Sequence, residues 1–149
     1  MTERAGICDA KWLDAHCWPV RVYYEDTDAG GVVFYANYLK FMERARTEWL
    51  RSLGVEQHQL AQETDIGFVV ANLDMTYLAP AHLDDMLVIQ TRITQIGRAS
   101  LNFFQRVIRS DDILAQGNIR VGCVRLSRLK PAALPDSLRT KIVNLNKMP

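Results

Sequence analysis

Residues 36–53 read ANYLKFMERARTEWLRSL, and apolar side chains recur in this stretch every three or four positions. The apolar side chains that share one stripe of the expected helix are Tyr38, Leu39, Phe41, Met42, Ala45, Trp49, Leu50 and Leu53. Gly54 follows where helices commonly end. The predicted helix is about 27 Å long. So wide an apolar face indicates that something large, such as a curved sheet, wraps the helix.

The segments on either side of this helix indicate strands that form such a sheet. Trp18, Val20, Val22 and Tyr24 alternate with other residues and predict a first strand with one apolar face. A short helix is predicted over 56–62, a closing helix over 135–147, and strands over 68–78, 87–96, 100–109 and 113–126. Short turns between the strands favour antiparallel neighbours. The expected fold class is therefore α+β, with a long central helix wrapped by a curved antiparallel sheet of about five strands.

The composition is typical of one globular domain. The chain has 149 residues, of which 48% are hydrophobic and 23% are charged, close to the average for soluble domains. We expect a loose N-terminal extension over residues 1–15 and a single domain over residues 16–149. The net charge of +1 gives no support for nucleic acid as a partner.

Three further features bear on the compartment. No apolar run of roughly 18 residues is present, so the sequence predicts no membrane span. Residues 1–14 lack the apolar core of a signal peptide, which favours a cytoplasmic location. Cys8, Cys17 and Cys123 are odd in number and not at metal-ligand spacing, so we expect them to be reduced thiols.

An acidic, glycine-containing loop lies between the first strand and the long helix. Residues 23–35 read YYEDTDAGGVVFY and contain three carboxylates, Glu25, Asp26 and Asp28. A carboxylate held at a loop-to-helix junction favours hydrolytic chemistry, because it supplies a base or nucleophile. The unpaired N–H groups of the helix N-terminus can then bind a developing oxyanion.

Several stretches of this chain resemble the hotdog-fold acyl-CoA thioesterases of the 4-hydroxybenzoyl-CoA thioesterase family, above all those associated with the Tol-Pal system. The stretches are YEDTDAGGVV at 24–33, Tyr38, ERAR at 43–46, YLAPA at 77–81, LDDML at 83–87 and LKP at 129–131. The resemblance runs from about residue 18 to about residue 138. It implies a hotdog fold, an acyl-CoA substrate, no metal or cofactor, and a homodimer or homotetramer with active sites at the subunit junction.

The resemblance also implies roles for residues of the acidic loop. Asp28 matches the catalytic aspartate of the family, acting on a thioester either as general base or as nucleophile. Tyr35 matches the residue whose backbone N–H polarises the carbonyl, and Gly31 lets the backbone approach the substrate closely. Many relatives carry a histidine where this chain has Tyr35, and no histidine lies near the loop in the sequence.

Coenzyme A carries a 3′-phosphate and a pyrophosphate, so cations are expected where it binds. Arg98 in a predicted hairpin turn, and Arg128 and Lys130 after the last long strand, are the candidates. Ser100 either bonds the pantetheine arm or caps the hairpin. Side chains that either line an acyl pocket or pack in the core are Phe34, Phe68 and Met75.

Alternatives stay open at this point. Asp26 either braces the loop through an Asx-type turn or tunes Asp28. Glu43 is a second candidate carboxylate, because another branch of hotdog thioesterases places its catalytic carboxylate on the central helix. The same fold also suits a non-catalytic acyl-CoA-binding or scaffold protein. A metal-dependent phosphotransferase using Asp26 and Asp28 fits the order of elements poorly, and a hotdog dehydratase lacks its histidine.

Overall fold

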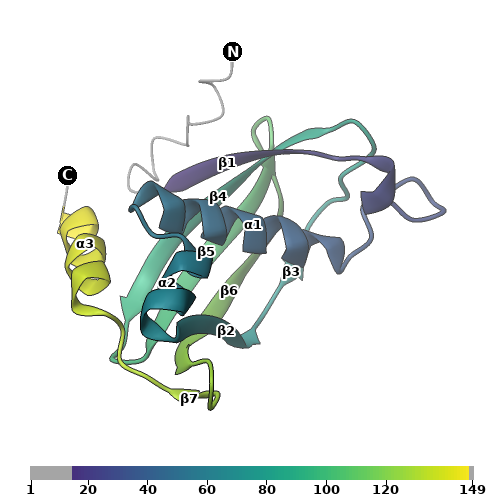
Figure 1. Ribbon diagram of the computed structural model, residues 1–149. Coiled ribbons are helices and arrows are strands. Elements are labelled where there is room, and N and C mark those ends of the chain that lie inside the picture. The colour runs from purple at the N-terminus through teal and green to yellow at the C-terminus, as the bar shows by residue number, and fades with distance from the viewer. Residues whose placement is uncertain (1–14, 148–149) are drawn as a thin grey trace.

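The structure, a computed structural model, describes residues 15–147 and contains one antiparallel sheet. The sheet order is β1-β4-β5-β6-β2, and the short strands β3 and β7 pair with β6. The strands are β1 (His16–Arg21), β2 (Ile66–Leu73), β3 (Thr76–Tyr77), β4 (Met86–Ile96), β5 (Ser100–Arg109), β6 (Asp112–Arg125) and β7 (Lys130–Pro131). Figure 1 shows the strands running side by side behind a long helix.

The long helix is α1 (Asn37–Ser52), and it lies along the curved sheet (Figure 1). Its predicted apolar stripe is buried: Tyr38, Phe41, Met42, Ala45, Trp49 and Leu50 are each at most 6% exposed. The Trp49 ring meets Phe103 of β5 edge to face, with ring centroids 5.1 Å apart. The apolar stripe of α1 is wide, so a flat surface would leave part of it in water. The curved sheet buries the whole width of the stripe.

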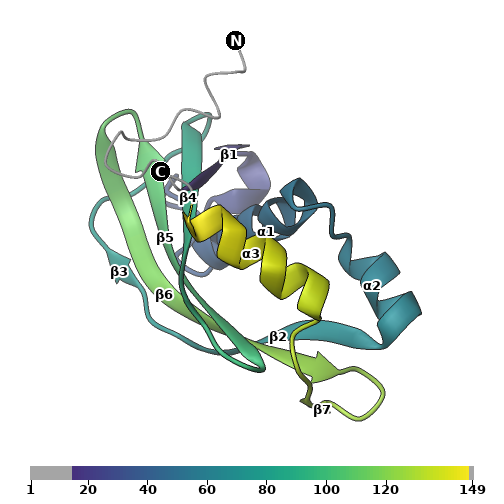
Figure 2. The ribbon, with the colours of Figure 1, turned by 90° about the vertical axis from the view of Figure 1, so that its left-hand side faces the viewer.

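Two further helices cover the ends of the sheet. The short α2 (Gln57–Thr64) follows α1, and α3 (Asp136–Lys147) lies across one side of the molecule in Figure 2. Arg139 of α3 donates to the carbonyl of Gly97 at 2.7 Å, and Lys141 donates to that of Leu53 at 3.0 Å. These bonds tie α3 to the β4–β5 turn and to the end of α1.

The fold class and the long helix are as predicted, whereas the first strand ends earlier than expected. We expected Tyr24 on the inward face, but its side chain is 81% exposed. The strand ends at Arg21, and a 3₁₀ turn spans Tyr24–Asp26. The carboxylate of Asp26 accepts the N–H of Tyr23 at 2.8 Å, which gives the backbone an alternative to the strand ladder.

The strand predicted over 68–78 is interrupted. The register of β2 against β6 shifts at a bulge between Val70 and Asn72, and is then constant from Leu73 opposite Ile119 to Thr76 of β3 opposite Gln116. Between them the chain presses against Gly117, where an added Cβ would lie 2.0 Å from the Asp74 carbonyl oxygen. The interruption is thus a close backbone approach that a glycine permits.

The remaining expectations concern the termini and the cysteines. The loose extension expected over 1–15 lies almost wholly outside the described residues. Cys123 is a buried free thiol, as expected, and burial raises its pKa. The expectation is wrong for Cys17, which is disulfide-bonded. Within residues 15–147, no helix combines the length and apolar character needed to cross a membrane.

Candidate active site

The acidic loop forms a small hairpin that carries Asp28 at its turn. Thr27 pairs with Val33 across the hairpin, and the Gly31 N–H donates to the Asp28 carbonyl at 3.0 Å. Gly31 adopts a φ of +82°, which disfavours any residue with a Cβ. The Asp28 side chain is exposed, and its Oδ1 accepts the Gly30 N–H at 2.8 Å. The turn therefore holds one carboxylate oxygen and leaves the other open to solvent.

Asp26 fastens this hairpin to the start of α1. Its side chain is only 5% exposed. Oδ1 accepts the Asn37 side-chain amide at 2.6 Å, and Oδ2 accepts the Tyr23 N–H at 2.8 Å. The Asp26 carbonyl accepts the N–H of Phe34 at 3.0 Å. Asp26 is thus a structural brace, the first of the two roles considered for it.

Tyr35 lies in the turn that leads into the first turn of α1, and it carries the backbone amide predicted to bind an oxyanion. Within residues 15–147, no hydrogen bond has the N–H of Tyr35 or Ala36 as its donor. The Tyr77 hydroxyl donates to the Tyr35 carbonyl at 2.9 Å, which fixes the peptide that follows this amide. Burial, with Tyr35 and Tyr38 nearby, raises the pKa of Tyr77 above its ordinary value, so the hydroxyl stays a donor at neutral pH. An unpaired N–H at a helix start is a ready site for a negative oxygen.

An apolar cavity of 320 Å³ opens beside this first turn. Its walls are Val33, Tyr35, Tyr38, Tyr77, Leu78, Ala79 and Pro80. The Tyr35 ring is 65% exposed and contacts Phe34 and Tyr77. Tyr35 therefore presents both an amide and an aromatic surface beside the hairpin.

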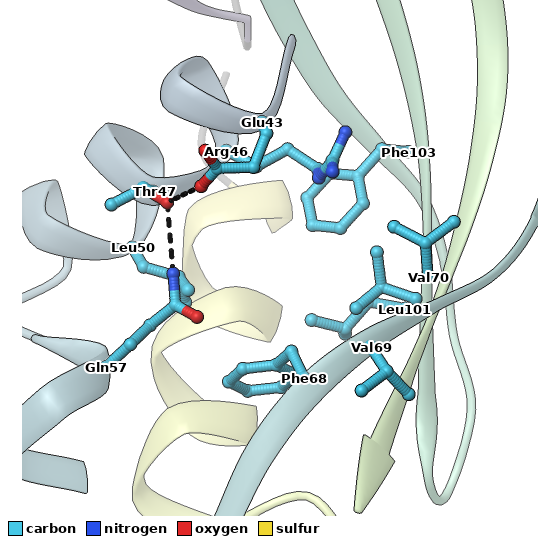
Figure 3. A pocket seen from close by; sticks show the side chains of 11 residues that line it. Glu43, Arg46, Thr47, Leu50, Gln57, Phe68, Val69, Val70, Leu101 and Phe103 are labelled. Carbon is cyan, nitrogen blue, oxygen red and sulfur yellow. Dashed lines mark hydrogen bonds between the residues drawn. The ribbon is translucent and has the colours of Figure 1, made fainter. Parts of the chain in front are cut away.

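A second cavity, of 170 Å³, lies between α1 and the edge strand β2 (Figure 3). One wall is apolar and includes Phe68, Val70, Leu101 and Phe103. Phe68 also packs against the core, the other role considered for it. The other wall carries Glu43, Thr47 and Gln57 from α1 and α2. Thr47 donates to Glu43 at 2.5 Å and accepts from Gln57 at 3.0 Å. The cavity is apolar with one polar side, as ligand pockets commonly are.

The predicted coenzyme A contacts lie far from Asp28 within one chain. Arg98 is in the β4–β5 turn, Ser100 begins β5, Arg128 is in the β6–β7 turn, and Lys130 begins β7. We call this group the cationic end, and residues 27–38 with 80–85 the hairpin end. The β4 strand runs from one end to the other over 11 residues, which is about 35 Å at the usual rise. One chain does not bring the two groups together (Figure 1).

Sequence reasoning did not predict three groups near the hairpin: the Tyr77 hydroxyl, Asp85 and Arg109. Arg109 donates to Asp85 at 2.8 Å beside the turn that contacts the hairpin. Tyr77 and Asp85 stand in the stretches that carry the family resemblance, and that was their only sequence signal. Within residues 15–147, no group of three or more His, Cys, Asp and Glu side chains is arranged to hold a metal ion.

The sequence pattern that defines the thioesterase superfamily matches residues 30–116 of this chain. The chain belongs to the thioesterase superfamily. It is 44% identical to the acyl-CoA thioesterase YbgC of Haemophilus influenzae, over 86% of this chain and 94% of that protein. It is 51% identical to the acyl-CoA thioester hydrolase YbgC of Escherichia coli O6:H1, over 81% of this chain and 90% of that one.

Solved structures of thioesterases share the hotdog fold of this chain. A 1,4-dihydroxy-2-naphthoyl-CoA thioesterase from Synechocystis matches with a TM-score of 0.82 at 26% identity, over 90% of this chain and 99% of that one. A probable thioesterase from Bartonella henselae matches with a TM-score of 0.78 at 33% identity, over 81% and 99%. The expected family and the expected fold are both confirmed.

Proposed function

We propose that this chain hydrolyses an acyl-CoA thioester to a free acid and coenzyme A, with Asp28 as general base or nucleophile. The observation that carries this proposal is the free N–H of Tyr35 at the start of α1, next to the hairpin that presents Asp28. A carboxylate and an oxyanion donor are the two groups that thioester hydrolysis requires. The names of the YbgC relatives supply the substrate class.

Either role of Asp28 gives a balanced reaction. As a base, Asp28 takes a proton from water, the water oxygen attacks the thioester carbon, and the Tyr35 N–H binds the resulting oxyanion. Collapse then breaks the C–S bond, and the sulfur leaves as a thiolate that takes up the proton. As a nucleophile, Asp28 itself attacks the thioester carbon and expels coenzyme A as the thiolate, which leaves a mixed anhydride. Water then hydrolyses the anhydride, which releases the acid, restores Asp28 and supplies the proton that the thiolate takes up.

We further propose that two chains pair along the edge strand β2 and complete the site together. Val69, Val70 and Leu73 on this strand are between 40% and 47% exposed, and an exposed apolar edge favours strand-to-strand pairing. The separation of Asp28 from the cationic end within one chain supports the same idea. The cations of one chain would then hold the nucleotide of a substrate whose thioester meets Asp28 of the other, in a homodimer or a homotetramer built from such pairs.

The acyl group, in this proposal, enters the cavity between α1 and β2. A volume of 170 Å³ is close to that of engineered cavities, of about 150 Å³, that hold benzene. It therefore favours short aliphatic or single-ring acyl groups over long fatty chains. In a thiol-release assay over a panel of acyl-CoAs, kcat/KM should fall as the acyl chain lengthens, and a preference for long chains would contradict this assignment.

Asp28→Asn tests the catalytic assignment. We expect kcat to fall by at least ~100-fold in the thiol-release assay with the thermal unfolding midpoint unchanged, because the amide keeps the shape but cannot act as base or nucleophile. Glu43→Gln is the matched comparison, since Glu43 lines the cavity between α1 and β2 and another branch of the fold uses a carboxylate on this helix. If kcat falls in Glu43→Gln and not in Asp28→Asn, Glu43 is the catalytic base or nucleophile in place of Asp28. Tight acyl-CoA binding by the wild-type protein without thiol release would instead support a scaffold.

We also propose a cytoplasmic location, because the buried Cys123 is a free thiol and reducing compartments keep thiols free. A disulfide at Cys17 instead favours an oxidising compartment, because reducing compartments disfavour disulfides. Thiol titration of protein alkylated at cell lysis distinguishes the two. Alkylation of Cys17 at lysis, which requires that its disulfide be reduced in the cell, would support the cytoplasm, and a protected Cys17 would contradict that location.

A further inference from the structure

One buried peptide joins the two halves of the proposed catalytic site. The N–H of Ala81 donates to the hydroxyl of Tyr38, in the first turn of α1, at 3.1 Å. The Ala81 carbonyl accepts the N–H of Val33, in the hairpin that carries Asp28, at 2.8 Å. The neighbouring His82 pairs with Val32 of the same hairpin. The position of Ala81, which is 0% exposed, therefore sets how the Asp28 hairpin lies relative to the helix start.

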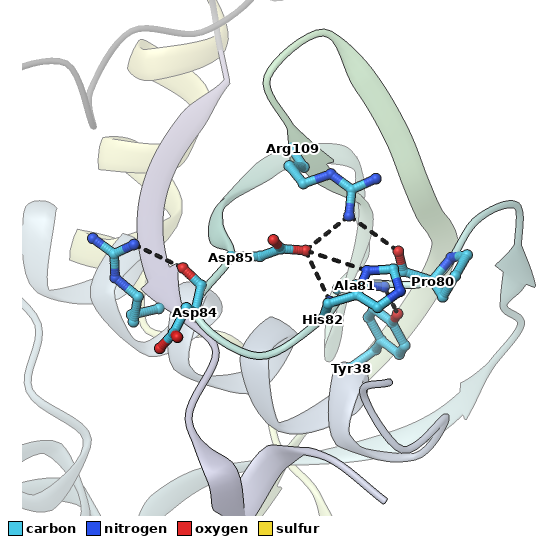
Figure 4. A network of polar contacts seen from close by, with 8 residues as sticks. Tyr38, Pro80, Ala81, His82, Asp84, Asp85 and Arg109 are labelled. Atoms are coloured by element: carbon cyan, nitrogen blue, oxygen red, sulfur yellow. Dashed lines mark hydrogen bonds and ion pairs between the residues drawn. The ribbon is translucent and has the colours of Figure 1, made fainter. Parts of the chain in front are cut away.

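An ion pair holds the chain on both sides of Ala81 (Figure 4). Asp85 accepts the N–H of His82 at 2.8 Å through Oδ2. Nη1 of Arg109 donates to the same oxygen at 2.8 Å and to the Pro80 carbonyl at 3.2 Å. Arg109 stands at the end of β5, between β4 and β6, so the pair braces the turn against the sheet.

The charges around this pair keep it ionised at neutral pH. Burial acts to raise the pKa of Asp85, but the His82 N–H and the Arg109 guanidinium outweigh it and leave the pKa below its ordinary value. Two other titratable groups face the pair, and one of them, the His82 ring, has its Nδ1 3.9 Å from Asp85 Oδ2. Tyr38, below the turn, has its pKa raised by burial and stays a neutral hydroxyl.

We propose that Asp85 and Arg109 are positioning residues for the hydrolysis: by fixing Ala81, their ion pair sets the geometry between Asp28 and the Tyr35 N–H. This inference rests on the proposed function of Asp28. Attack on a thioester requires the oxygen nucleophile and the oxyanion donor to be placed together, and a shift of about 1 Å can cost ~100-fold in rate. Neither residue is assigned a contact with substrate, so their loss should act on kcat rather than on binding.

The first experiment measures kcat and KM by thiol release for Asp85→Asn, Arg109→Gln and Arg109→Lys. We expect Asp85→Asn and Arg109→Gln to lower kcat by about 10-fold or more with KM within about twofold. Arg109→Lys keeps the charge and should recover most of that loss. The matched control is Asp84→Asn, because the neighbouring Asp84 side chain is exposed and only its backbone holds the turn; its kcat should equal that of the wild type.

A double-mutant cycle separates positioning from general stabilisation. If Asp85 acts through Asp28, adding Asp85→Asn to Asp28→Asn should not slow the residual turnover further. Equal multiplicative losses in both backgrounds, or a normal kcat in Asp85→Asn, would overturn the proposal. Arg109→Gln provides a second cycle if Asp85→Asn does not fold. Full activity in Asp28→Asn alone would instead defeat the proposed function, so the two failures are distinguishable.

Discussion

The hairpin end and the cationic end of the molecule are built in opposite ways. At the hairpin end, buried or half-buried carboxylates hold the backbone: Asp26 binds Tyr23 and Asn37, and Asp85 binds His82. At the cationic end, Arg128 and Lys130 are exposed side chains on a turn. Fixed geometry suits the making and breaking of bonds, whereas long mobile cations suit the capture of a phosphate. The difference is consistent with the proposal that one chain carries chemistry and recognition at separate places, which two paired chains would bring together.

The largest effect is expected from a charge placed on the edge where two chains are proposed to meet. Val70→Asp should give a monomer by sedimentation and lower turnover by at least ~100-fold, because a buried unpaired carboxylate is strongly disfavoured in an interface. Leu129→Asp places the same charge on an exposed turn, and its sedimentation should match the wild type. A Val70→Asp monomer with normal kcat would mean that one chain suffices.

Removal of the Asp26 brace should have the next largest effect. Asp26→Ala leaves the Tyr23 N–H and the Asn37 amide without their acceptor, a loss of about 3 kcal/mol for hydrogen bonds to a charged group. For a domain of this size the unfolding midpoint should fall by about 6–12 °C, and kcat should fall with it. Calorimetry checks this against Glu25→Gln, an exposed neighbour expected to melt like the wild type. Equal midpoints in the two variants would show that the brace is dispensable.

A smaller effect, of a different kind, is expected at the cationic end. The double variant Arg128→Ala/Lys130→Ala should raise KM for acyl-CoA by about 10-fold and leave kcat intact, since the lost contacts bind ground state and transition state alike. The KM difference from wild type should shrink as salt is added. A fall in kcat without a change in KM would remove the distinction drawn here between the two ends.

The smallest effect is a pH dependence of stability at the hairpin end. Asp85 has a folded-state pKa below its ordinary value of 3.8, so its carboxylate stabilises the fold above that pH. The contribution is lost as pH falls through the lowered pKa, where the folded state also becomes protonated. Urea unfolding of Asp85→Asn should therefore show a deficit at pH 7 that narrows below about pH 4. A deficit that is constant with pH would mean that the charge contributes nothing.

Local patterns predicted the fold better than the site. The period of α1 lies within one stretch of sequence, so Tyr38 and Trp49 were correctly assigned to the buried face. Tyr24 was wrongly assigned to the buried face, because the Asp26 carboxylate accepts the Tyr23 N–H and the strand ends before Tyr24. The alternation of apolar residues gives no indication of that hydrogen bond. The Asp28 loop was recognisable as one continuous motif. The partnership of Asp85 with Arg109, 24 residues away, depends on strand register and turn geometry that no local pattern contains.

The close approach at Gly117 has a consequence for the behaviour of the protein in a crowded solution. An unpaired, apolar β-edge is a template on which strands of other chains can add without limit. On the β2 side of the sheet, the bulge between Val70 and Asn72 and the break between β2 and β3 divide the free edge into short pieces. Gly117, by admitting the Asp74 carbonyl oxygen, keeps that edge short enough for one partner strand to cover and so opposes fibrous aggregation.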